Sequence, residues 1–306
     1  MTVKLNELSA SRIVDLLSAK GYQCDVWGQP ERVVSRALPV SHSTESSLCF
    51  IRDGRNFISE QLHQIQGVVI APKEMRQLVD RAIKSATWIL VDSPDAAFYE
   101  TLRLMFVNDE GVETHESAIV LSGASLGRDV SIGPFSRIGS GVTIGSGVIV
   151  GSGCSIQNCV IGDSVQIQDG VMIGSEALGA VKRPNGTWVD RVSIGIVHIG
   201  SRSRIENNSV VQRGFLSDTR IGEDVRIGPN CSIGNGVTVG RGSLIAQGVV
   251  VAGSVQIGED CAVWGNASIR EGIHLGVGCT VGMGAVVLNN LDRNSTYVGV
   301  PARKLR

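Results

Sequence analysis

The chain of 306 residues is long enough for a sizeable core, and 38 glycines with only 4% aromatic residues indicate a narrow core of small and β-branched side chains. Its 28 Lys and Arg nearly balance 29 Asp and Glu, which argues against nucleic acid or a charged membrane surface as a partner. The N-terminus lacks the apolar core of a signal peptide and no stretch is long enough to span a bilayer, so we expect a cytoplasmic protein without membrane insertion.

The first part of the chain predicts helices alternating with short apolar strands. Residues 5–21 carry apolar side chains at helical spacing, namely Leu8, Ile13, Leu16 and Leu17. The segments 66–72 and 86–92 are typical of buried strands, and 95–109 predicts a second helix. We therefore expect a small α/β domain over residues 1–112, joined to the remainder by a linker at about 110–116.

A six-residue period dominates the remainder of the chain. From Ile221 to Val287 an aliphatic residue returns at every sixth position, and the residue two places before it is small or aliphatic. The period begins near Val120 and is interrupted at 178–191 and 212–219. This hexapeptide pattern predicts a β-solenoid over residues 113–290, a parallel β-helix of roughly ten coils whose outward side chains are free to form sites.

The cysteines fit the same pattern. Five of the seven occupy the small inward position two places before an aliphatic residue: Cys154, Cys159, Cys231, Cys261 and Cys279. No Cys or His spacing typical of a metal site occurs, so we predict buried, apolar thiols and no metal. Residues 291–306 leave the period through polar turns and predict a basic C-terminal tail.

Several segments together carry a resemblance to a known family. They are the stretches IGSEALG and RPNGTWVDR, the segment RGFLSDT, and LCFIRDGRNF with the helix DAAFYETLRLMF. From about residue 5 to 290 the chain resembles the UDP-3-O-acylglucosamine N-acyltransferases of lipid A biosynthesis. That resemblance implies a uridine-type nucleotide-binding domain, a left-handed β-helix with hexapeptide repeats, and a homotrimer with sites between subunits.

The resemblance assigns nucleotide binding to Phe50 and the residues after it. An aromatic residue stacks on uracil in the family and an asparagine three places later binds the base; here these positions are Phe50 and Asp53, with Arg55 beside them. A carboxylate only accepts hydrogen bonds, so Asp53 would accept from uracil N3–H or from the N1–H and N2–H groups of guanine. The identity of the base is therefore left open. The alternatives are that Phe50 is an aromatic residue of the core and that Asp53 is a turn residue.

The catalytic histidine of the family is replaced by Asn235. An amide cannot take a proton at neutral pH, but it can orient a neutral amine, so the replacement favours N-acylation over O-acylation. Asn235 also suits a plain corner of the solenoid. Among the histidines, we expect His274 to be the better second candidate because it lies within a few coils of Asn235, and we expect His198 to point outward at the surface.

Two further groups of residues are candidates for binding. Arg183, Trp188 and Arg191 in the interruption, with Arg213 after it, would cover a sugar diphosphate. The resemblance of the C-terminal segment to acetyltransferases that use coenzyme A implies that an acyl donor is bound by a third group: Gly282, Gly284, Ala285, Arg303 and Lys304. The alternative for residues 178–191 is a flexible surface loop, and the alternative for the basic C-terminal residues is a cap on the last coil.

These observations lead to one expected function and two alternatives. We expect an N-acyltransferase that moves a short acyl group from acyl-coenzyme A, as co-substrate, onto the amine of a nucleotide-linked sugar, with no bound cofactor. The first alternative is the family's own reaction in lipopolysaccharide synthesis, with a hydroxyacyl group on acyl carrier protein. The second is a non-catalytic solenoid that binds nucleotide sugars.

Overall fold

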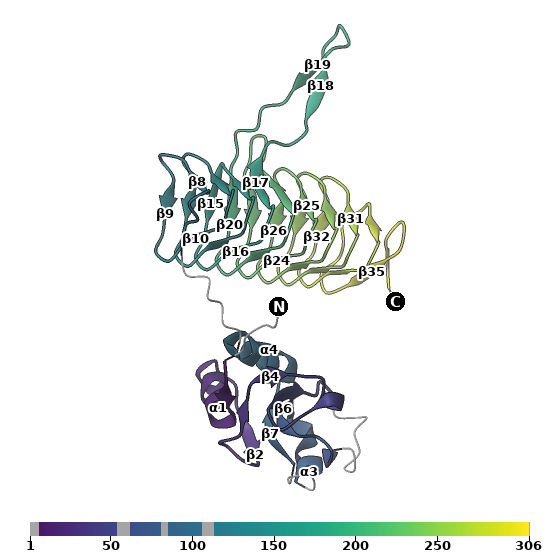
Figure 1. Ribbon diagram of the computed structural model, residues 1–306. Helices are drawn as coiled ribbons and strands as arrows, with labels where there is room; N and C mark the ends of the chain where they lie inside the picture. The colour runs from purple at the N-terminus through teal and green to yellow at the C-terminus, as the bar shows by residue number, and fades with distance from the viewer. Residues whose placement is uncertain (1–5, 54–61, 81–84, 106–112, 306) are drawn as a thin grey trace. The chain divides into compact units, whose positions relative to one another are not determined.

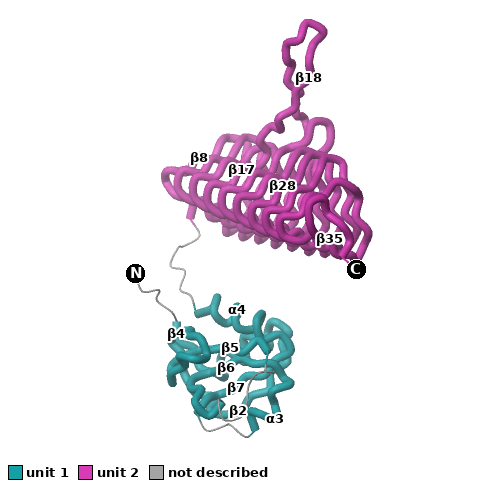
Figure 2. Tube along the Cα trace, turned by 90° about the vertical axis from the view of Figure 1, so that its right-hand side faces the viewer, with its two compact units in different colours: residues 1–109 teal, residues 110–306 magenta. Residues whose placement is uncertain are grey.

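The computed structural model describes residues 6–53, 62–80, 85–105 and 113–305. The chain divides into two compact units, Met1–Asp109 and Glu110–Arg306 (Figure 2). Each unit has its own apolar core. Among the described residues, no helix has the length and apolar character needed to cross a bilayer.

The first unit contains a five-stranded sheet in the order β2-β7-β6-β5-β4. Its strands are β2 (Asp25–Trp27), β4 (Arg36–Ala37), β5 (Ser47–Phe50), β6 (Gly67–Pro72) and β7 (Ala86–Val91). The pairs β4–β5, β5–β6 and β6–β7 are parallel, whereas β2 is antiparallel to β7. The short pair β1 (Leu8–Ser9) and β3 (Val33–Val34) lies outside this sheet.

Alternating side chains of β5, β6 and β7 build two cores. Leu48, Ile70 and Ile89 pack with α1 (Ala10–Ala19) and α4 (Pro94–Met105), while Cys49, Val69 and Trp88 pack with η2 (Lys73–Met75) and α3 (Arg76–Val79). The described part of this unit also contains the 3-10 helix η1 (Val40–His42). Because strands β6 and β7 are covered on both faces, they are buried throughout. The predicted helices and strands of an α/β domain are confirmed.

The second unit is a parallel β-helix with three sheets, so the β-solenoid predicted from the hexapeptide period is confirmed (Figure 1). We name each sheet by its first strand. The β8 sheet contains β8 (Ile119–Val120), β11 (Arg137–Ile138), β14 (Ser155–Ile156), β17 (Met172–Ser175), β22 (Val210–Gln212), β25 (Ser232–Ile233), β28 (Val250–Val251), β31 (Ser268–Ile269) and β34 (Val286–Val287).

The other two sheets have the same arrangement. The β9 sheet contains β9 (Ser125–Leu126), β12 (Thr143–Ile144), β15 (Cys159–Ile161), β20 (Val197–Ile199), β23 (Thr219–Ile221), β26 (Thr238–Val239), β29 (Gln256–Ile257) and β32 (His274–Leu275). The β10 sheet contains β10 (Ser131–Ile132), β13 (Ile149–Val150), β16 (Gln166–Ile167), β21 (Arg204–Ile205), β24 (Arg226–Ile227), β27 (Leu244–Ile245), β30 (Ala262–Val263), β33 (Thr280–Val281), β35 (Thr296–Val298) and β36 (Arg303–Lys304). The left-handed winding implied by the resemblance stays a prediction.

Two inward positions in each hexad fill the solenoid core. From β11 to β34 the aliphatic residue of each strand in the three sheets is buried, and the residue two places before it is buried as well. The five cysteines at this smaller position are free and buried, as predicted. A serine there bonds to the backbone of the next coil: Ser243 Oγ donates to Gly258 O (2.9 Å) and accepts from Cys261 N (3.0 Å). The coil backbone therefore satisfies both the donor and the acceptor of the buried Ser243 hydroxyl.

The C-terminal segment differs from the expected basic tail. Strand β35 pairs in parallel with β33, so that Tyr297 takes the register position of Val281 and joins the core. Strand β36 then folds back antiparallel to β35. The apolar ring of Tyr297 explains the difference, because it supplies the inward side chain that one further coil requires.

Candidate functional site

Two successive coils have long connections at one corner of the solenoid, and the next coil places Asn235 in an ordinary turn at the same corner. The chain passes there from the β8 sheet to the β9 sheet, through residues 176–196, then 213–218, then 234–237. The strands on either side remain in register, since β17 pairs with β22 and β22 with β25. Both interruptions of the hexapeptide period and the Asn235 position therefore lie together, and we call this place the β8–β9 corner.

The longest connection forms a hairpin that extends away from the solenoid (Figure 1). Strand β18 (Ala180–Lys182) pairs antiparallel with β19 (Trp188–Asp190). Near its tip, Arg183 Nη1 donates to Trp188 O (2.8 Å), and Lys182 Nζ lies 5.2 Å from the centre of the exposed Trp188 ring. Arg183 and Trp188 thus stabilise the hairpin itself, away from the corner at its base.

Two predicted arginines, Arg191 and Arg213, have partners at the base of the hairpin. The guanidinium of Arg191 lies over the Phe215 ring, 5.6 Å from its centre. Arg213 Nη2 donates to Glu176 Oε1 at 2.7 Å, and the Arg213 side chain is only 16% exposed. Within the described residues, Arg213 Nε is buried without a hydrogen-bond partner. A buried donor of this kind leaves one position for an acceptor from a ligand.

Asn235 lies one coil from this base and is half-buried. Its backbone oxygen accepts from Ser254 N (2.8 Å), and Gly236 has the positive φ of +64° that turns the chain. Gly236 N donates to Thr219 Oγ1 (2.9 Å), which itself donates to Gln212 O (2.7 Å). These bonds fix the corner backbone, so the Asn235 side chain is presented from a rigid turn.

A second polar cluster at this corner was not predicted as a site. Asp218 Oδ2 accepts from His198 Nε2 (3.0 Å) and from Arg220 Nη2 (2.6 Å), while Asp218 Oδ1 accepts from Ile196 N (3.0 Å). The backbone N–H of Ile196, followed by His198 and Arg220, holds the pKa of the Asp218 carboxyl below its usual range. The RGFLSDT segment contained the signal, since this aspartate is its last residue before strand β23 begins at Thr219.

His274 does not have the advantage of proximity that the sequence indicated. Strand β26 is the first strand after Asn235. In the β9 sheet, β32, which carries His274, lies two strands from β26 on one side, and β20, which carries His198, lies two strands from β26 on the other. The His274 backbone N donates to Asn290 Oδ1 (2.9 Å), and its side chain lines a cavity of about 440 Å³ with Arg293 and Leu291. In coils, the two histidines are therefore equally far from Asn235.

The residues predicted to bind an acyl donor do not form one group in the structure. Ala285 is completely buried and faces the core, which contradicts a place in an outer groove. A side chain at Gly282 would meet Val298 of β35, whereas Gly284 faces open space. Lys304 pairs with Asp292 at 3.0 Å and Arg303 Nη1 donates to Ala302 O, so both stabilise the end of the solenoid. Only Gly284 keeps the geometry that the prediction required.

The predicted nucleotide residues follow β5. Phe50 is half-buried and stacks on Phe98 of α4, with ring centres 4.5 Å apart. Arg52 beside it forms an ion pair with Asp95 at 2.9 Å. Asp53 is half-buried at the end of this segment, while Arg55 lies outside the described residues. Because Phe98 covers one face of Phe50, at most the opposite face can stack on a base.

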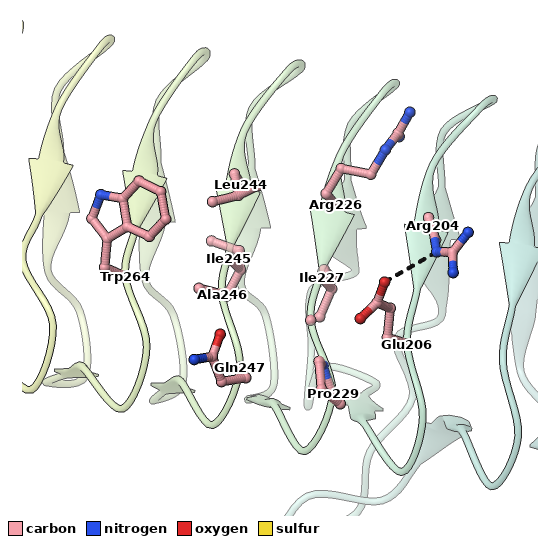
Figure 3. Close-up of a pocket in the computed structure, with 11 residues that line it drawn as sticks. Arg204, Glu206, Arg226, Ile227, Pro229, Leu244, Ile245, Ala246, Gln247 and Trp264 are labelled. Carbon is pink, nitrogen blue, oxygen red and sulfur yellow. Dashed lines mark hydrogen bonds and ion pairs between the residues drawn. The ribbon is translucent and has the colours of Figure 1, made fainter. Parts of the chain in front are cut away.

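A slot on the β10 sheet is a further concave feature, with a volume of about 240 Å³. Figure 3 shows Trp264 at one end and the Arg204–Glu206 pair at the other, with Ala246 between them. Gly228 and Ala246 occupy equivalent outward positions on adjacent coils, so the wall recedes there. This slot was not predicted, although the sequence places Gly228, Ala246 and Trp264 at equivalent positions of successive coils.

Comparisons with known proteins match the solenoid. The repeat model "Bacterial transferase hexapeptide (six repeats)" matches residues 123–158 and 218–253, and "Hexapeptide repeat of succinyl-transferase" matches 254–289. The UDP-3-O-acylglucosamine N-acyltransferase of Pseudomonas entomophila is 44% identical over 64 residues, which are 21% of this chain and 18% of that protein. The chain thus matches less than a fifth of that relative's length.

Solved structures support the fold over a longer range. The UDP-N-acetylglucosamine acyltransferase of Campylobacter jejuni is 23% identical with a TM-score of 0.57, covering 63% of this chain and 74% of that one. The UDP-N-acetylglucosamine O-acyltransferase of Moraxella catarrhalis is 23% identical with a TM-score of 0.58, covering 63% and 73%. The solenoid therefore carries bacterial transferase hexapeptide repeats on a fold shared with sugar acyltransferases.

Proposed function

We propose that this protein is an N-acyltransferase that moves an acyl group from a thioester onto the amine of a nucleotide-linked amino sugar. The transferase repeats and the partial likeness to UDP-3-O-acylglucosamine N-acyltransferase support the reaction class. The observation that carries the proposal is the β8–β9 corner, where the hairpin base, Arg213 and Asn235 lie on successive coils.

The chemistry of the corner suits an anionic acceptor with an amine. Arg213 Nε offers an unpaired donor and Arg191 supplies a second guanidinium, which together fit a sugar diphosphate. The Asn235 side chain accepts a hydrogen bond from the amine and so aims its lone pair at the thioester carbon. Orientation of two bound substrates accounts for a large part of such a rate enhancement.

Exposed apolar side chains at the same corner support a homotrimer in which a neighbouring subunit covers the site. Leu178 is 93% exposed and Leu216 is 85% exposed, and Val192 and Ile194 lie close by in sequence. Large apolar side chains gathered in this way mark an interface. Light scattering tests the assembly: a mass of three chains supports it, and a monomeric mass at micromolar concentration contradicts it.

A panel assay tests the reaction. The protein is incubated with UDP-, GDP- and dTDP-linked amino sugars, each with acetyl-coenzyme A or with hydroxyacyl-acyl carrier protein, and products are identified by mass spectrometry. An amide product with coenzyme A supports a short acyl donor. An amide formed only with carrier protein supports the donor of the lipid A enzymes. No acyl product from any pair contradicts the proposal.

A further inference from the structure

We propose that the slot beside Trp264 is a second ligand site, which binds a nucleoside phosphate with its base on the indole ring and its phosphate on Arg204 and Arg226. The slot lies on the β10 sheet, which is the side of the solenoid that does not form the β8–β9 corner. The inference therefore goes beyond the proposed acyl transfer and does not depend on it.

The two ends of the slot lie a fixed distance apart along one sheet. Strands β21, β24, β27 and β30 are consecutive in the β10 sheet, and Figure 3 shows the residues of the slot along them. Arg226 belongs to β24 and Trp264 follows β30, so two coils separate them. With neighbouring strands about 4.8 Å apart, this separation is roughly 10 Å. A ligand that contacts both ends is therefore elongated, as a nucleoside phosphate is.

One end of the slot is positively charged. Arg204 and Arg226 are register partners on neighbouring strands. Among the described residues that line the slot, Glu206 is the one acid, and its Oε1 accepts from Arg204 Nε (3.1 Å). Arg226 Nη1 donates to Arg202 O (2.7 Å), while Nη2 of neither lining arginine has a hydrogen-bond partner within the described residues. One excess positive charge with open guanidinium donors suits a phosphate.

The other end offers an aromatic platform. The side chain of Trp264 is 48% exposed, and its backbone N donates to Val281 O (2.9 Å) of the next coil, so the indole is held on a rigid strand. Every nucleobase has a π-face that can stack on such a ring. The amide of Gln247, which also lines the slot, has a donor and an acceptor for the edge of a base.

The middle of the slot is small and largely apolar. Ala246 has the place of Trp264 one coil earlier, and Leu244 lines the slot beside it. The volume of about 240 Å³ lies just below the range of about 300–1,000 Å³ that is usual for sites of drug-sized ligands. The ligand is therefore small, and the middle of the slot has room for a sugar ring between the base and the phosphate.

Isothermal titration calorimetry with UMP and AMP tests the site. UMP represents the nucleotide of a sugar acceptor and AMP represents the nucleotide of coenzyme A, so the tighter ligand identifies the source. Uridine lacks the phosphate and inorganic phosphate lacks the base. We expect each of these two fragments to bind at least about 10-fold more weakly than the nucleotide, since each loses the contacts of one end.

Variants at each part of the slot locate the binding. We expect Trp264→Leu and Arg226→Gln each to weaken it about 10-fold to 100-fold, and Trp264→Phe, which keeps an aromatic face, to retain most of it. Ala246→Leu fills the middle and should block binding with both ends intact. The matched control is Arg137→Gln, because Arg137 also precedes an aliphatic residue but lies in the β8 sheet, and it should bind as the wild type does. The melting temperature of each variant checks its fold.

The outcomes separate this inference from the proposed function. Ligand bound elsewhere in the chain remains in Trp264→Leu, so the loss of one equivalent per chain identifies the slot. No binding of UMP or AMP at millimolar concentration overturns the inference, as does an unchanged affinity in folded Trp264→Leu or Arg226→Gln. Inorganic phosphate that binds as tightly as UMP also overturns it. A chain that binds a nucleotide in the slot but forms no acyl product contradicts only the acyl transfer.

Discussion

At the scale of single residues, Asn235 is the side chain whose removal is most informative. We expect Asn235→Ala to lower kcat about 10-fold to 100-fold, since losing one orienting hydrogen bond weakens the transition state by about 1–3 kcal/mol. The matched control is Asn207→Ala, because Asn207 has the same place in its hexad at another corner, where its backbone oxygen accepts from Asn230 N (2.9 Å). Equal kcat values for Asn235→Ala and Asn207→Ala would contradict a role of Asn235 in the reaction.

The buried cysteines make a second prediction at this scale. Burial raises the pKa of the Cys159 thiol to about 12 and is the main cause that raises the pKa of Cys279 to about 12. A raised thiol pKa means less thiolate at pH 8, and the thiolate is the reactive form. We expect iodoacetamide to label Cys24, which is half-buried, before the six buried cysteines of the native protein. Peptide mass spectrometry checks this, and fast labelling of Cys159 would contradict the packing.

At the scale of elements, the hairpin is separable from the solenoid. Its strands pair with each other and its sequence contributes nothing to the solenoid core. We expect replacement of 178–191 by a short Gly-Ser connection to change the melting temperature by no more than about 3 °C and to abolish transfer. The small thermal effect follows from the exposure of these residues, since surface changes usually stay within about 0.5 kcal/mol. A collapse of the solenoid would show that the hairpin is structural.

Hexapeptide periodicity predicted the elements well because each inward position must be small or aliphatic for the coils to stack. It also located the interruptions at 178–191 and 212–219, but a missing repeat does not tell which corner a loop leaves. The His198–Asp218 contact joins residues twenty positions apart across such a loop, so no periodic rule could pair them. Ala285 is different, because the period itself placed it inward and only the resemblance placed it in a groove.

At the scale of the whole molecule, two units with separate cores predict two unfolding events. Removing a buried side chain costs about 2–5 kcal/mol, mostly within the unit that loses it. We expect Ile13→Ala to lower one calorimetric transition and Ile233→Ala to lower the other, because Ile13 and Ile233 belong to different cores. Val250→Ala, an outward residue of the β8 sheet, is the control and should leave both in place. One transition that moves with either variant would contradict independent units.

The central proposal, amine acylation at the β8–β9 corner, is tested most directly by a crystal structure with a nucleotide-linked amino sugar. We predict the sugar amine within about 3 Å of the Asn235 side-chain oxygen, with a phosphate oxygen on Arg213 Nε. A sugar bound instead in the slot beside Trp264, with the corner filled only by water, would contradict the proposal.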